Sequence, residues 1–219
     1  MSINTDTVSQ MITSLPDNAD MTAILEKAER LQPGETLFLR GIEWQEYQSL
    51  LVKFANQSSP RLAYNNGVME IMSPRLDHEQ PNRMLQDLVT IISDELAIEI
   101  LNCGSTTFTA ASLQKGVEPD TCFYIANEAK IRDKDTIDLM SDPPPDLVIE
   151  IDVTSPSLDK FPIYAAMNVP EIWRYTKQEV AFYHLGNSGY QRQATSANFP
   201  FLQLQDVMRF LNACAAIGQ

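Results

Sequence analysis

Two carboxylates lie inside one strongly apolar segment of the chain. Glu150 and Asp152 belong to the run 147–153, and all the remaining residues of this run are aliphatic. Strand side chains alternate between two faces, so this run predicts a β-strand with Glu150, Asp152 and Val148 on the same face. Two ionised groups about 6–7 Å apart repel each other, and a bound cation, a cationic side chain or a raised pKa relieves the repulsion. Asp120 opens a second strand-like run, and three acids on two strands favour a site for a hard cation such as magnesium or manganese.

The rest of the chain predicts the scaffold that positions these acids. Apolar residues at helical spacing predict helices over 21–31, 43–56, 77–99, 159–168 and 205–215, with Pro81 in the first turn of the third. Apolar or alternating runs predict strands over 61–64, 68–72, 106–111, 121–125, 147–153, 172–175, 180–184 and 190–192, and Asn66-Gly67 predicts a tight hairpin between the first two. Residues 1–19 are predicted to be mobile, and 127–145 to form a charged loop.

This order of elements predicts an α/β or α+β protein with a mixed central β-sheet flanked by helices. We expect an N-terminal tail and an outlying helix over residues 1–34, followed by one domain over residues 35–219.

Composition restricts the cellular location and the partners. No window approaches the roughly 18 apolar residues of a membrane span, and no secretion signal is visible, so we expect a cytoplasmic protein that does not cross a membrane. Three cysteines in apolar runs are typical of reduced core thiols.

The net charge of −13, from 29 acidic and 16 basic residues, opposes long-range attraction to nucleic acid. DNA would therefore be bound weakly or in a local groove.

Several short blocks in a fixed order give the chain a family resemblance. Pro119-Asp120 followed by Glu150 in an apolar strand resembles the PD-(D/E)xK pattern of the restriction-endonuclease-like nuclease superfamily. More narrowly, the ordered blocks resemble the bacterial family described as putative restriction endonucleases, over roughly residues 38–212. These blocks are Met72-Ser73-Pro74 with His78, Pro119-Asp120, Pro145–Glu150, Ser155-Pro156-Ser157 and Val169–Trp173. The resemblance implies a restriction-endonuclease-like fold around a mixed sheet.

The resemblance also implies a metal site and a migrated lysine. Asp120 and Glu150, helped by the backbone carbonyl of Ile151, would bind one or two Mg²⁺ or Mn²⁺ ions. The superfamily pattern expects a lysine two residues after the strand glutamate, and this position is Asp152. In the narrower family a lysine that enters the next helix, four residues before a tyrosine, stands in for it. That residue is Lys160, and its ammonium would orient or activate the attacking water.

Some of these residues keep a second interpretation. Asp152 is a metal ligand, an ion-pair partner of Lys160, or a mark of lost activity. Asp120 is alternatively a turn residue after Pro119. His78, ahead of the long helix, contacts phosphate or transfers protons, or is a helix cap or surface residue. Asp146 is expected to open its strand.

The function predicted from these residues is that of a magnesium-dependent DNA endonuclease that leaves a 5′-phosphate, as the resemblance implies. Duplex cleavage usually needs two such sites, which makes a homodimer the expected assembly. Two other functions stay open. One is a catalytically drifted interaction protein of the same fold, which the net charge and Asp152 favour. The other is a metal-dependent hydrolase of a small phosphoester or nucleotide, for which an acidic surface matters less.

Overall fold

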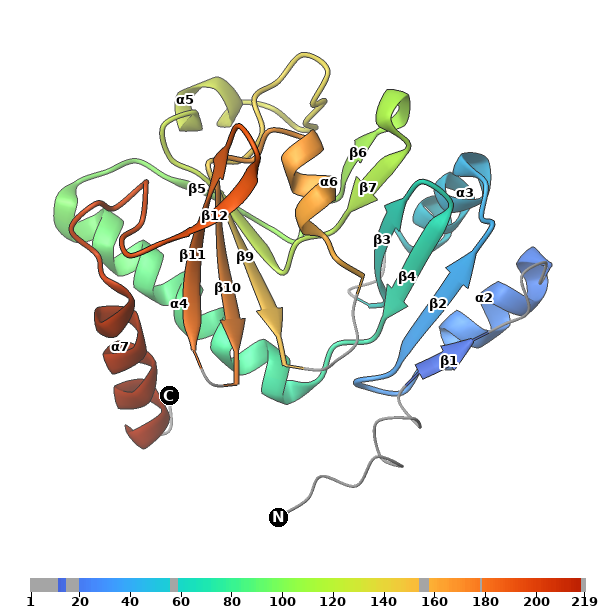
Figure 1. The fold of residues 1–219 in the computed structure, drawn as a ribbon, viewed down its shortest axis with the longest axis horizontal. Coiled ribbons are helices and arrows are strands. Elements are labelled where there is room, and N and C mark those ends of the chain that lie inside the picture. The colour runs from blue at the N-terminus through green and yellow to red at the C-terminus, as the bar shows by residue number, and fades with distance from the viewer. Residues whose placement is uncertain (1–11, 15–19, 56–58, 154–157, 178, 218–219) are drawn as a thin grey trace. The chain divides into compact units, whose positions relative to one another are not determined.

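The structure is a computed structural model that describes residues 12–14, 20–55, 59–153, 158–177 and 179–217. The chain forms two compact units, each built on a six-stranded sheet (Figure 1). The first unit comprises Met1–Leu76, Thr109–Glu118 and Thr154–Lys160, and the second Asp77–Phe108, Pro119–Val153 and Phe161–Gln219. The predicted α+β class is confirmed, although the strands form two sheets and not a single central one. The predicted domain boundary after residue 34 falls inside the first unit and stays a prediction.

The first unit contains the sheet β1-β2-β4-β3-β7-β6. Asn66 and Gly67 connect β3 to β4 with φ angles of 47° and 86°, the positive values that a two-residue hairpin turn requires. The predicted hairpin is thus confirmed. The strands are β1 (Ile12–Ser14), β2 (Thr36–Arg40), β3 (Arg61–Asn65), β4 (Val68–Met72), β6 (Phe108–Ala110) and β7 (Lys115–Val117).

Two amphipathic helices complete the core of the first unit. The carboxylate of Asp20 accepts a hydrogen bond from Ala23 N at 2.9 Å and caps α2 (Met21–Glu29). A capping box of Glu43 and Glu46 begins α3 (Trp44–Phe54). Both helices share one hydrophobic cluster with the strands, which includes Ile24, Ala28, Leu37, Tyr47, Leu50, Leu62, Tyr64 and Ile71.

The second unit contains the sheet β12-β11-β10-β9-β8-β5. β9 and β10 are parallel, and the other neighbouring strands of this sheet are antiparallel, so the sheet is mixed as predicted. Its strands are β5 (Leu101–Gly104), β8 (Thr121–Tyr124), β9 (Leu147–Asp152), β10 (Glu171–Thr176), β11 (Val180–Gly186) and β12 (Gly189–Gln193). Its helices are α4 (Leu76–Leu96), α5 (Glu128–Ile131), α6 (Phe161–Ala166) and α7 (Leu204–Ile217).

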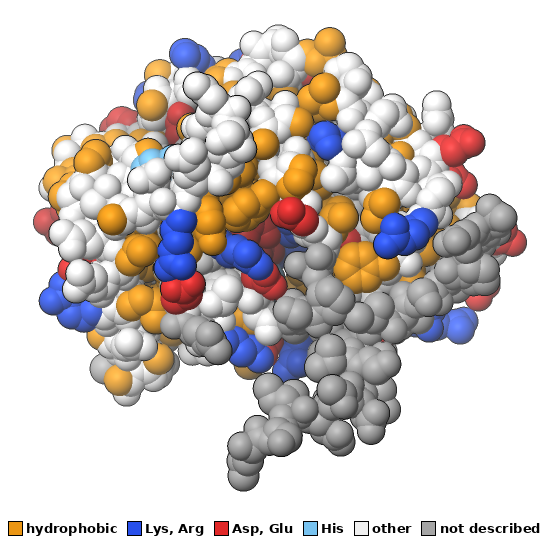
Figure 2. Space-filling view, viewed as in Figure 1, with side chains coloured by type: hydrophobic (Ala, Val, Ile, Leu, Met, Phe, Trp, Pro, Cys, Tyr) orange, Lys and Arg blue, Asp and Glu red, His pale blue; other side chains and the backbone are white. Residues whose placement is uncertain are grey.

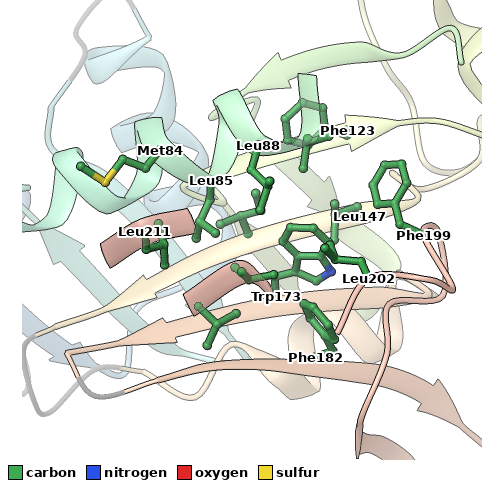
Figure 3. Close-up of a cluster of buried hydrophobic side chains, with 14 of the residues drawn as sticks. Met84, Leu85, Leu88, Phe123, Leu147, Trp173, Phe182, Phe199, Leu202 and Leu211 are labelled. Carbon is green, nitrogen blue, oxygen red and sulfur yellow. The ribbon is translucent and has the colours of Figure 1, made fainter. Parts of the chain in front are cut away.

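The core of the second unit lies on one face of this sheet, where α4 and α7 cover it (Figure 3). Leu147, Ile149 and Ile151 of β9 belong to this core, as the alternation of the sequence predicted. Val148, Glu150 and Asp152 therefore belong to the opposite face, as also predicted. We call this opposite face the acidic face of the sheet. The core residues of α4, α7 and the neighbouring segments include Met84, Leu85, Leu88, Phe123, Trp173, Phe182, Phe199, Leu202 and Leu211.

Some elements differ from the sequence-based expectation. β1, β2, β5 and β7 were not predicted. The single-turn helix α5 lies inside the predicted loop 127–145. Pro81 lies inside α4 and not in its first turn, because the helix begins at Leu76. None of the helices in the described residues is both long and apolar enough to cross a bilayer.

Candidate functional site

Asp120 and Glu150 lie on neighbouring antiparallel strands of the second unit. The β8–β9 register pairs Thr121 with Ile149, and one step further along this register Asp120 is level with Glu150. Opposite residues in a ladder project on the same side of the sheet. Both acids are buried, with exposed fractions of 2% for Asp120 and 7% for Glu150. The sheet thus brings two buried carboxylates from distant parts of the chain to one place.

Asp120 is held from both β9 and α4. Its Oδ2 accepts a hydrogen bond from the backbone N–H of Ile151 at 2.7 Å. Asn82 of α4 donates from Nδ2 to the backbone oxygen of Asp120 at 3.2 Å. In a strand the N–H and C=O of one residue point toward the same neighbour. The carbonyl of Ile151 is therefore directed to the side on which Asp120 lies.

His78 is the third residue of α4 and lies beside Asp120. Its Nε2 is 3.1 Å from Asp120 Oδ2, and its Nδ1 is 3.5 Å from Glu79 Oε1. The side chain is almost fully buried, so the interpretation of His78 as a surface residue is wrong. Burial arises because this end of α4 packs on the strand pair that carries Asp120.

Glu150 accepts a hydrogen bond from a buried tyrosine. The Tyr164 hydroxyl, on α6, donates to Glu150 Oε1, and the Tyr164 side chain is fully buried. Burial raises the pKa of Tyr164 well above its ordinary value, and the charges of Glu150 and Asp120 raise it further. The hydroxyl is therefore a stable proton donor at neutral pH. In the sequence Tyr164 had served only to locate Lys160; the structure makes it a direct neighbour of the candidate site.

Asp152 has an arginine partner that the sequence did not reveal. Arg174 Nη2 forms an ion pair with Asp152 Oδ2. Arg174 lies on β10, where the parallel register pairs it with Glu150. Of the three ways to relieve repulsion between Glu150 and Asp152, the structure therefore shows a cationic side chain. Arg174 lies in the predicted strand 172–175, whose pattern does not indicate a pairing with Asp152.

Lys160 directly precedes α6, which begins two residues later than the predicted start at Asp159. Its side chain is half-buried. Lys160 belongs to the first unit, whereas Glu150 belongs to the second. Its approach to Glu150 or Asp152 stays a prediction. The block Ser155-Pro156-Ser157 lies outside the described residues.

The donor set of the strand pair fits a hard divalent cation. Among the described residues, no group of three or more His, Cys, Asp and Glu side chains is arranged to hold a metal ion. Magnesium in proteins is commonly bound by one or two carboxylates, with water and substrate oxygens completing its shell. Asp120 and Glu150, with the carbonyl of Ile151, provide oxygen ligands of this type and number.

Other residues noted in the sequence have structural surroundings. Asp146 accepts hydrogen bonds from Ile125 N at 2.7 Å and from Asn127 N at 2.9 Å, and so fixes the loop that follows β8. Cys103, Cys122 and Cys214 are free thiols; Cys122 is buried, as expected of a core thiol, whereas Cys103 and Cys214 are only partly buried.

Glu171 is a buried acid whose role sequence analysis missed. It is fully buried at the start of β10 on the core face, since Trp173 of the same strand belongs to the core. Its carboxylate accepts from Trp173 Nε1 at 2.9 Å, Ser196 Oγ at 3.2 Å, Ala197 N at 3.0 Å, and Asn198 N and Nδ2 at 3.0 and 2.7 Å. These contacts fix the loop before α7. Nothing in a lone glutamate at a strand start predicts them.

Charged side chains of both signs are interspersed on the face drawn in Figure 2. Some Lys and Arg side chains on this face adjoin Asp or Glu side chains. Ion pairs of the second unit include Asp152 with Arg174 and Lys177 with Asp77.

Comparisons with known proteins agree on a nuclease-like family and fold. A family model described as "Uma2: Putative restriction endonuclease" matches residues 44–215. The chain is also similar to a crystal structure of a protein from Anabaena variabilis, described as a putative nuclease belonging to DUF820. The TM-score is 0.53 at 15% identity, and the match covers 78% of this chain and 99% of that chain. At this identity the likeness shows the fold alone. No curated protein matches the chain.

Proposed function

The chain belongs to the family of restriction-endonuclease-like proteins whose model matches residues 44–215, and from this premise we propose that it is a metal-dependent endonuclease that hydrolyses phosphodiester bonds of DNA. Restriction-endonuclease-like nucleases typically depend on a divalent metal ion. The ion proposed for this chain is Mg²⁺, with Mn²⁺ as a substitute, and the proposed products carry a 5′-phosphate.

One observation carries the proposal. Asp120 and Glu150 are buried at the same level of an antiparallel strand pair, and Asp120 is tied to Ile151 by a hydrogen bond of 2.7 Å. Burying two neighbouring carboxylates is costly, and a divalent cation between them offsets that cost. An oxygen-rich site of this kind suits magnesium better than softer metals.

Each residue of the proposed site has a distinct task. Asp120, Glu150 and the carbonyl of Ile151 would hold the ion, which would supply an acidified water and polarise the scissile phosphate. His78 keeps Asp120 in its orientation, since its Nε2 lies 3.1 Å from Asp120 Oδ2. Lys160 orients the attacking water and offsets charge that develops on the phosphate.

The proposed substrate has consequences for assembly and location. Cleavage of both strands of a duplex usually requires two active sites, so we propose a homodimer. Genomic or invading DNA as a substrate implies a cytoplasmic location. The net charge of −13 implies that DNA is bound weakly or in a local groove, with affinity that falls steeply with salt.

A cleavage assay with matched variants tests this function. Supercoiled plasmid is incubated with the wild type in Mg²⁺, in Mn²⁺ and in a chelator, and nicked and linear products are quantified. We expect metal-dependent cleavage that falls by about 10²-fold or more in Asp120→Asn and Glu150→Gln. Lys160→Met should also abolish cleavage but keep metal binding, because lysine acts on water and phosphate. Glu179→Gln, which removes a half-exposed acid of the same unit, is the control.

The catalytically drifted interaction protein remains the second candidate, and the Asp152–Arg174 ion pair favours it. This pair relieves the charge repulsion of Asp152 without a metal ion. A calorimetric titration with Mg²⁺ separates the two, since a drifted site binds no metal. Wild-type protein that binds metal yet cuts nucleotides and not plasmid would instead establish a small phosphoester as the substrate.

A further inference from the structure

Arg174 lies on the acidic face, next to the proposed metal ligands. The parallel register of β9 and β10 pairs Arg174 with Glu150. Paired residues of neighbouring strands project on the same side of a sheet, so Arg174 shares its side with Glu150 and Asp152. β9 and β10 run side by side in Figure 1. The acidic face therefore has a guanidinium one strand away from the carboxylate proposed to hold the metal.

The surroundings of Arg174 hold its guanidinium in place without enclosing it. Nη2 pairs with Asp152, and the guanidinium carbon lies 5.9 Å from the centre of the Phe161 ring. The Arg174 side chain remains 39% exposed, whereas that of Asp152 is 17% exposed. A guanidinium has five N–H donors in a planar fork, and the Asp152 carboxylate and the Tyr183 hydroxyl, which also accepts a hydrogen bond from Arg174, occupy only part of them. The fork can therefore bind a second oxyanion from the solvent side.

A phosphodiester is the oxyanion that this face would meet under the proposed function. Asp120, Glu150 and Asp152 would repel it, and a fixed guanidinium offsets that repulsion where it is strongest. Arginine suits phosphate recognition because its donors match two phosphate oxygens at once.

We propose that Arg174 binds a phosphate of the substrate beside the metal ligands, and that Asp152 is a positioning residue that holds the guanidinium there. This inference rests on the proposed function and deepens it. It assigns to β10 the positive charge that the superfamily pattern would place at position 152. Asp152 is then a part of the site and not a mark of lost activity.

Substitutions at the two members of the pair should have different effects only if Arg174 binds phosphate. A structural pair that joins β9 to β10 loses the same interaction whichever partner is removed, so Asp152→Asn and Arg174→Met would behave alike. If Arg174 binds phosphate, Arg174→Met weakens DNA binding, whereas Asp152→Asn leaves it unchanged or strengthens it. Arg174→Met removes the cation. Asp152→Asn keeps the cation and its position, because the asparagine carbonyl still accepts a hydrogen bond from the guanidinium, and removes only a competing negative charge.

The experiment measures binding apart from cleavage. Fluorescence anisotropy of a labelled DNA duplex is followed in Ca²⁺ over a range of salt concentrations, for the wild type, Arg174→Met, Asp152→Asn and Arg209→Met. Arg209 is the control, because it pairs with Asp206 on α7, the helix that covers the core face. We expect Arg174→Met to weaken DNA binding about tenfold. The slope of log K for binding against log salt concentration should become smaller in magnitude by about one. Asp152→Asn should bind as tightly as the wild type or more tightly, and Arg209→Met should match the wild type.

Circular dichroism melts and the plasmid cleavage assay complement the binding measurement. Circular dichroism melts establish whether each variant folds. If Arg174→Met does not fold, Arg174→Lys replaces it. Arg174→Lys should weaken DNA binding several-fold, since a single ammonium cannot hold Asp152 and phosphate at once.

Unchanged DNA binding and an unchanged salt dependence in the folded variant would overturn the assignment of Arg174, as would an equal loss of binding in Asp152→Asn. If the wild type cleaves plasmid while Arg174→Met binds and cleaves normally, only this inference fails. If the wild type neither binds nor cleaves DNA, the proposed function fails with it.

Discussion

The sheet of the second unit carries buried carboxylates on both faces, and their surroundings differ. On the core face, Glu171 is enclosed by hydrogen-bond donors from Trp173 and from the loop that contains Ser196 and Asn198, and His184 Nε2 lies 3.5 Å from its Oε1. On the acidic face, Glu150 lies level with Asp120, shares its strand with Asp152, and has an arginine and a tyrosine as neighbours. Both environments bury charge, but only the second gathers several acids.

The difference shows that burial alone does not identify a functional acid. Hydrogen-bond donors fixed by the fold offset the desolvation of Glu171, so this carboxylate needs no ligand. Asp120 and Glu150 lie level in the register, and the charges of both raise the pKa of the Tyr164 hydroxyl. A group of neighbouring acids favours metal chemistry, whereas an acid with a full set of hydrogen-bond donors favours stability.

The largest effect should come from the core-face acid. Glu171→Ala leaves the donors of Trp173, Ser196 and Asn198 buried without an acceptor, and we expect the free energy of unfolding to fall by about 3–5 kcal/mol. Urea denaturation followed by circular dichroism measures this change. Glu179→Ala is the control: it removes an acid that is 49% exposed and paired with Arg192, and should cost less than about 1 kcal/mol. Equal losses in the two variants would contradict a structural role specific to Glu171.

The metal response of the acidic face should be the next largest effect. An ion that binds the folded state stabilises it by about 2.7 kcal/mol at a hundredfold excess over its dissociation constant. Melting temperature should therefore rise with Mg²⁺ or Mn²⁺ in the wild type, much less in Glu150→Gln, and normally in Glu171→Gln if that variant folds. A flat wild-type response, together with Glu150→Gln melting higher than wild type at every metal concentration, would indicate a strained acidic pair that binds no metal.

The smallest effect concerns the hydroxyl that joins α6 to Glu150. Tyr164→Phe removes a hydrogen bond to a carboxylate, and we expect a loss of about 1.5 kcal/mol at neutral pH. Loss of this support should also weaken metal binding about tenfold. Denaturation curves and metal titrations measure the two quantities.

The same variant has a pH dependence with a defined sign. The pKa of Tyr164 is raised in the folded protein, so its stabilising contribution is complete below the ordinary phenol pKa of about 10 and is lost as the pH rises toward the folded value. The stability advantage of the wild type over Tyr164→Phe should thus shrink above pH of about 10. The other tyrosines are common to both proteins and cancel in the difference. An advantage that stays constant to pH of about 11 would argue against a proton held on this hydroxyl.

Local sequence determined the faces of the strands and the order of the elements. The alternation in 147–153 separated Ile149 and Ile151 from Glu150 and Asp152, because strand side chains repeat with period two. Asn66-Gly67 specified its hairpin, because the turn needs positive φ angles at both positions. Ordered blocks such as Pro119-Asp120 were enough to identify the family, and with it the fold class. The strands β5 and β7 were missed, because each contains only one or two apolar residues.

Tertiary structure alone decided which side chains meet. The β9–β10 register, joining residues 22 positions apart, gave Asp152 its partner Arg174. Packing of α4 placed His78 beside Asp120, and α6 brought the Tyr164 hydroxyl to Glu150. Sequence spacing cannot supply these contacts, because strand order and register are set by burial of the whole core and not by any local pattern. The candidate acids could thus be read from the chain, whereas the residues that hold and balance them became visible only in the folded sheet.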